Sequence, residues 1–166
     1  SHTGASELGT AWANFWGAAT MFPLKRYYFQ PLTHSIRKSN PRTLVLFSWE
    51  RGSFGHEHDL RSFCRAWRAL PAVAPQDFDG VISPTPDETL WVKWFADRLA
   101  IVNDSPEERE IELTLPRPLK KGEILVDFAT NKVLLEYDKD SFREIKVKIK
   151  LKPFDLHTLA ILKLKK

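Results

Sequence analysis

The chain has 166 residues, of which 43% are hydrophobic and 28% are charged, and its formal net charge is +4 at pH 7. This apolar fraction is ample for a packed core and excludes a disordered tail or a collagen-like repeat. A single cysteine excludes an internal disulfide and a zinc site built from several cysteines. No run approaches the roughly 20 apolar residues that a membrane span requires, so we expect no membrane partner.

Before residue 75 the pattern of apolar residues indicates helices on either side of one strand. Apolar side chains recur every three or four positions over residues 8–19 and 24–36, which predicts two helices, and Pro31 predicts a kink or a fresh helix start within the second. Residues 43–48 run without polar alternation, as in a strand covered on both faces. A third helix, for which Asp59 is the expected N-cap, completes a βα unit. Its apolar stripe comprises Leu60, Phe63, Cys64, Trp67 and Leu70.

Residues 71–86 are rich in proline and show no sustained period, so we interpret them as the junction between two domains, residues 1–74 and residues 75–166. Beyond the junction the apolar period changes to two, and seven short strands at this spacing predict an antiparallel β-sandwich of about 90 residues. The predicted fold class is α+β, a short helical and βα segment followed by the sandwich. The predicted strands cover residues 90–95, 99–103, 110–115, 123–127, 132–136, 145–151 and 156–164. The first two flank residues 96–98, which predicts a hairpin.

Glu50 directly follows the predicted buried strand, between Trp49 and Arg51. In barrels of alternating strands and helices, residues at the carboxyl ends of the strands project into the active site. A carboxylate beside an aromatic ring suits glycoside hydrolysis, which commonly uses two carboxylates. Because the sequence offers one suitable strand, Glu50 supplies at most half of a catalytic site. A structural ion pair with a neighbouring arginine is the competing interpretation.

Trp91 and Trp94, together with Trp49, are candidate carbohydrate-binding residues. The odd spacing of Trp91 and Trp94 places them on opposite faces of one strand, so one of the two should be exposed or interfacial. The competing interpretation is that these rings belong to the core.

Three other clusters favour structural interpretations. The His-Glu-His-Asp run at residues 56–59 could present imidazoles to a metal, but zinc needs three or four ligands, so we expect no metal. Cys64 lies on an apolar stripe, which indicates a buried and unreactive thiol. Alternate lysines at residues 146–152 could contact phosphates, but no aromatic residues interleave on that face, so a solvated face is favoured over nucleic-acid binding. No glycine-rich phosphate loop is present, and we expect no cofactor.

Four segments, residues 42–52, 63–71, 91–103 and 151–159, carry a family likeness. Their order resembles the carboxyl-terminal portion of a glycoside hydrolase: the last strand and helix of a (β/α)8 barrel, then an all-β domain like those closing many amylase- and galactosidase-type enzymes. A complete barrel takes about 250 residues, so the resemblance implies that the upstream strands lie in another chain or were removed. The start at Ser1, with Met21 as the only methionine, favours an excised piece.

The resemblance implies the C-terminal part of a carbohydrate-active hydrolase, with a sandwich that buttresses the barrel, Glu50 as a rim residue, and no complete active site in this chain. The implied partners are a carbohydrate and either the remainder of the barrel or a second copy of the chain. An alternative is a carbohydrate-binding module that uses an exposed Trp91 or Trp94. Nucleic-acid binding through the lysine face is a third, weaker hypothesis.

Overall fold

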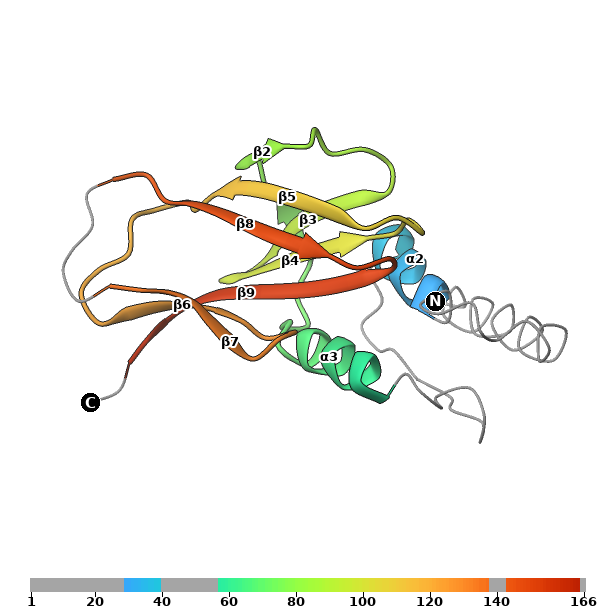
Figure 1. The fold of residues 1–166 in the computed structure, drawn as a ribbon, viewed down its shortest axis with the longest axis horizontal. Helices are drawn as coiled ribbons and strands as arrows, with labels where there is room; N and C mark the ends of the chain where they lie inside the picture. Colours follow the sequence, from blue (N-terminus) through green and yellow to red (C-terminus); the bar gives the residue numbers. More distant parts are fainter. Residues whose placement is uncertain (1–28, 40–56, 138–142, 165–166) are drawn as a thin grey trace, which may run out of the picture.

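The computed structural model describes residues 29–39, 57–137 and 143–164 (Figure 1). Within these ranges, two helices are followed by two antiparallel sheets, which confirms the predicted α+β fold with a β-sandwich. The elements are α2 (Gln30–Ser39), α3 (Glu57–Arg68), β1 (Gln76–Asp77), β2 (Val81–Ser83), β3 (Leu90–Phe95), β4 (Arg98–Asn103), β5 (Arg109–Thr114), β6 (Glu123–Asp127), β7 (Lys132–Glu136), β8 (Lys146–Leu151) and β9 (Asp155–Lys163).

Helix α2 begins at Gln30, with Pro31 in its first turn. Proline is tolerated there because its missing N–H would have no partner within the helix. The expectation of a fresh helix start at Pro31 is therefore confirmed. The expected helix at residues 8–19 and the expected strand at residues 43–48 lie outside the described residues.

Helix α3 begins at Glu57, so the expectation that Asp59 is its N-cap is wrong. Asp59 lies in the first turn, where a negative charge is favoured by the helix dipole. Its carboxylate also forms an ion pair with Lys152, with 3.1 Å between Oδ1 and Nζ. The predicted apolar stripe is confirmed: Phe63 is buried, and Leu60, Trp67 and Leu70 pack half-buried against the same cluster.

The larger sheet has the strand order β1-β3-β4-β9-β6-β7, and the smaller has the order β2-β5-β8. The predicted hairpin of β3 and β4 is confirmed, with Ala96 at a φ of 55° in its turn. Residues 71–86, which we interpret as a domain junction, contain the short strands β1 and β2, which pair with β3 and β5. Strands of two and three residues are too short to show a period. The domain boundary near residue 75 stays a prediction.

The two sheets enclose the main apolar core of the sandwich. Side chains alternate along each strand, so every second residue of the two facing sheets points inward. In β8 the buried residues alternate with exposed lysines over the whole strand, as the sequence predicted. The buried residues that the larger sheet contributes are Leu90, Val92, Leu99, Ile101, Leu125 and Leu159, and those of β5 and β8 are Ile111, Leu113, Val147, Ile149 and Leu151.

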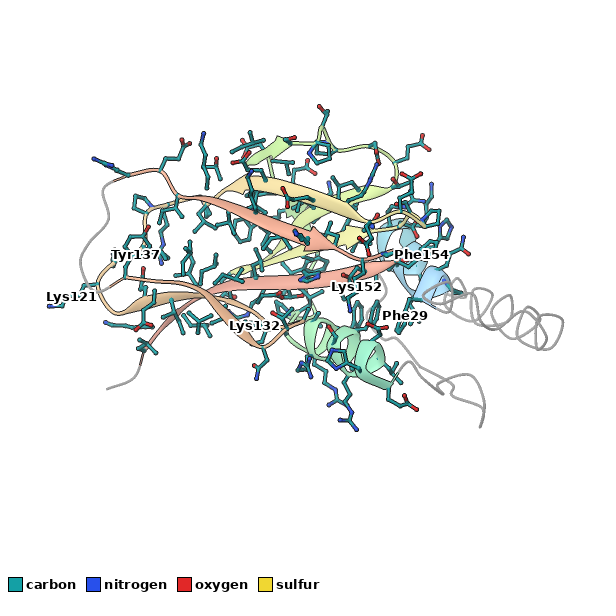
Figure 2. All side chains as sticks on the ribbon, in the orientation of Figure 1. Phe29, Lys121, Lys132, Tyr137, Lys152 and Phe154 are labelled. Carbon is teal, nitrogen blue, oxygen red and sulfur yellow. The ribbon has the colours of Figure 1, made fainter. Side chains whose placement is uncertain are left out.

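The opposite face of the larger sheet packs against the two helices (Figure 1). Phe29, immediately before α2, stacks on Phe63 of α3 with 5.6 Å between ring centroids. Both rings join Ala100, Val102 and Leu156 of the sheet in a second buried cluster, together with Phe154 from the β8–β9 turn. Phe29, Lys152 and Phe154 lie at the end of the sandwich nearest the helices, and Lys121 and Tyr137 lie at the opposite end (Figure 2).

Candidate functional site

Trp49 and Glu50 lie in residues 40–56, outside the described residues. This segment connects the last residue of α2, Ser39, to the first residue of α3, Glu57. Both helices belong to the cluster on the outer face of the larger sheet. The two ends of the segment that carries Glu50 are therefore fixed to the sandwich.

Trp91 and Trp94 lie on opposite faces of β3, as their spacing predicted. Trp94 packs against the core between the sheets and meets Phe78 edge to face, with 5.5 Å between ring centroids. Trp91 packs against the cluster beneath the helices and lies 5.9 Å from the Phe95 ring. Both side chains are half-buried. Each ring therefore packs partly against a core cluster, as the competing core interpretation expects.

The lysines of β8 lie on the exposed face of the smaller sheet, as predicted for a solvated face. Their partners on β5 are acidic: Lys150 lies opposite Glu110, and Lys148 opposite Glu112. Directly opposed charges of opposite sign favour strand pairing. They also offset the positive potential that a phosphate backbone would require. This arrangement favours a structural role for these lysines.

Cys64 is half-buried on α3, and burial raises the pKa of its thiol, against an opposing effect of Arg68. A raised pKa keeps the thiol protonated and unreactive at neutral pH. Among the described residues, no group of three or more His, Cys, Asp or Glu side chains is arranged so that it could hold a metal ion. No helix in the same part of the chain is long and apolar enough to cross a membrane.

A buried polar cluster, which we call the charged triad, consists of Asp127 on β6 and Asp155 and His157 on β9. His157 Nδ1 lies 2.8 Å from Asp127 Oδ2, and His157 Nε2 lies 3.0 Å from Asp155 Oδ2. All three residues are buried, at 2%, 5% and 6% exposure. They lie on the same inward-facing side of β6 and β9 as Leu125 and Leu159, at the end of the sandwich nearest the helices.

The triad contains a charged imidazole. A carboxylate oxygen only accepts hydrogen bonds, so an imidazole between two carboxylates must donate from both nitrogens. Burial by itself would lower the pKa of His157, but the hydrogen bonds and charges of Asp127 and Asp155 outweigh it and raise the pKa to about 9. Because both ring nitrogens are occupied, neither can serve a substrate or a metal. The chemistry of the triad is structural.

Another buried carboxylate, that of Asp104 directly after β4, holds α2. Its Oδ2 accepts a hydrogen bond from Arg37 Nε at 2.7 Å, and its Oδ1 accepts one from the Thr33 hydroxyl at 3.0 Å. His34 Nδ1 lies 3.3 Å from the same carboxylate. The Asp104 side chain is 4% exposed. One carboxylate thus fixes successive turns of α2 to the larger sheet.

Sequence reasoning missed both the charged triad and the Asp104 contacts. One signal was present: the alternation that places Leu159 and Ile161 in the core places His157 on the same face. A histidine on an inward-facing row requires hydrogen-bond partners, because an unpaired buried polar group is costly. The identity of those partners depends on the pairing of β6 with β9, which the sequence alone does not specify.

Comparisons of the chain with protein-family models, with curated proteins and with solved structures found no significant match.

Proposed function

We propose that this chain is the C-terminal part of a carbohydrate-active glycoside hydrolase, in which the β-sandwich supports the catalytic barrel and no complete active site lies in this chain. In this role Glu50 is a carboxylate at the rim of the barrel, and a second carboxylate comes from strands upstream of Ser1. The substrate class is a carbohydrate.

The observation that carries the proposal is the attachment of α2 and α3 to the sandwich at both ends of residues 40–56. Asp104 holds α2 through Arg37, and the carbonyl of Ala129, after β6, holds α3. Catalysis requires reacting groups to be positioned within fractions of an ångström, so a catalytic residue benefits from rigid attachments on either side. A sandwich that anchors both flanking helices suits a supporting role.

The order of elements gives further support. The last strand of a (β/α)8 barrel lies in sequence between two helices, and the strand that the sequence predicts at residues 43–48 would fall in the sequence between α2 and α3. The sandwich follows α3 after a short connection, as it does in the enzymes that the sequence resembles.

The binding-module alternative has less support from the described residues. Binding modules need aromatic rings that a sugar can reach, whereas Trp91 and Trp94 are half-buried and each contacts a core cluster. Nucleic-acid binding is disfavoured by the acidic residues opposite Lys148 and Lys150.

The test compares this chain with the same chain extended by the reading frame upstream of Ser1. We expect the purified chain to show no turnover of aryl glycosides and the extended protein to hydrolyse them. In the extended protein, Glu50→Gln should lower kcat by about 100- to 10,000-fold, the range for loss of an acid or base group. Glu57→Gln, at an exposed position of α3, is the matched control and should leave kcat unchanged. Turnover by the chain alone would refute the proposal.

A further inference from the structure

The charged triad is connected to helix α3 through two separate turns. The first begins at Asp127, whose Oδ1 accepts a hydrogen bond from the backbone N–H of Ala129 at 2.9 Å. The carbonyl of Ala129 in turn accepts hydrogen bonds from Ser62 Oγ at 2.8 Å and from Arg65 Nη2 at 2.7 Å, both on α3. Asp127 therefore shapes the turn that presents an acceptor to α3.

The second connection begins at Asp155. Its Oδ2, which lies beside His157 Nε2, also accepts a hydrogen bond from the backbone N–H of Lys152 at 2.9 Å. The side chain of Lys152 forms the ion pair with Asp59 in the first turn of α3. The residue after His157 contacts the same helix directly, since Thr158 Oγ1 donates to the carbonyl of Ala66 at 2.8 Å.

We propose that His157 is the central element of a charge-dependent latch, in which its imidazolium holds Asp127 and Asp155 in place and so fixes the two turns that anchor α3. Loss of that charge leaves two buried carboxylates facing each other across a neutral ring, which can donate to only one of them. The turns then lose their common support, and α3 separates from the sheet more readily than the two sheets separate from each other. The latch operates whether or not the chain serves a glycosidase.

Among the described residues, the charges that raise the pKa of His157 are those of Asp127 and Asp155. The charged groups on the anchoring contacts are Asp59, Arg65 and Lys152. Cys64 is the thiol on α3, and burial raises its pKa. The folded-state pKa of His157 is above its value of 6.5 in an unfolded chain, so the stabilisation is complete below about pH 6.5 and is lost as the pH rises through about 9.

The first test measures amide hydrogen exchange by mass spectrometry at pH 7 in the variant His157→Gln. Removing a charged hydrogen bond should accelerate exchange in residues 57–68 by about 10- to 100-fold. Exchange in β5, the central strand of the smaller sheet, should change by less than about twofold. His58→Gln, at an exposed position of α3, is the matched control and should match the unchanged chain. Equal acceleration in α3 and β5, or none in α3, would overturn the proposal.

The second test uses the unchanged chain and does not depend on the folding of a variant. Nitrogen NMR of the imidazole at pH 7 should show both His157 nitrogens protonated, and a neutral ring would overturn the proposal. After correction for the intrinsic pH dependence of exchange, protection of α3 should fall by at least about tenfold between pH 6.5 and 9.5 while that of β5 stays constant. A parallel fall in both elements, or no fall in α3, would contradict the latch.

Discussion

Replacing Asp104 by asparagine should release helix α2 from the sheet. The carboxylate is 4% exposed and its ion-pair partner, Arg37, is 15% exposed, so the pair is largely excluded from water. Removing one member of a buried pair costs about 3 to 5 kcal/mol, because the other is left with an unpaired charge. An asparagine oxygen can still accept from Thr33, so we expect the lower figure, about 3 kcal/mol. This corresponds to a roughly 100-fold larger opening constant for α2.

Hydrogen exchange in residues 30–39 measures that opening directly, because amides of a docked helix exchange only when it opens. Asp97→Asn is the matched control: the Asp97 side chain is 75% exposed and lies 3.4 Å from Arg98, and exposed pairs contribute about 0 to 1 kcal/mol. If Asp104→Asn accelerates α2 exchange by no more than Asp97→Asn, the clamp on α2 does not exist and the reasoning fails.

Two further predictions concern the sandwich. Leu113→Ala should lower the free energy of unfolding by about 2 to 5 kcal/mol, whereas Val133→Ala, at a side chain that is 52% exposed, should change it by less than about 0.5. Lys148→Glu, which opposes Glu112, should destabilise by about 0.5 kcal/mol at low salt and by less in 1 M salt.

Local sequence pattern was sufficient to predict most of the β-structure. Alternation over residues 145–151 predicted β8, because one of its faces is buried and the other is solvated. The turn around Ala96 predicted the β3–β4 hairpin, since the two strands are adjacent in sequence and pair locally. Strand β1 escaped prediction because its two residues are both exposed and leave no apolar alternation to detect.

The contacts between residues far apart in the sequence could not be predicted from the local sequence pattern. Asp127 and His157 are 30 positions apart and meet only because β6 and β9 are neighbours in the sheet. Asp104 and Arg37 are 67 positions apart and meet only because α2 packs on β4. The candidate sugar-contacting residues Trp91 and Trp94 were placed on opposite faces of their strand, but the contact of Trp94 with Phe78 depends on the packing of the two sheets. The sequence pattern therefore predicted which face of a strand a residue occupies, whereas the strand order and the packing of the helices determined which residues contact each other.

The most direct measurement of the supporting role is a complementation assay with two polypeptides. The barrel region that the proposal assigns to the enzyme outside this chain is expressed separately, this chain is titrated into it, and hydrolysis of an aryl glycoside is followed. The account predicts negligible hydrolysis by either polypeptide alone and a rate that rises with added chain until it saturates at one equivalent. An upstream polypeptide that is as active without this chain as with it would contradict the account.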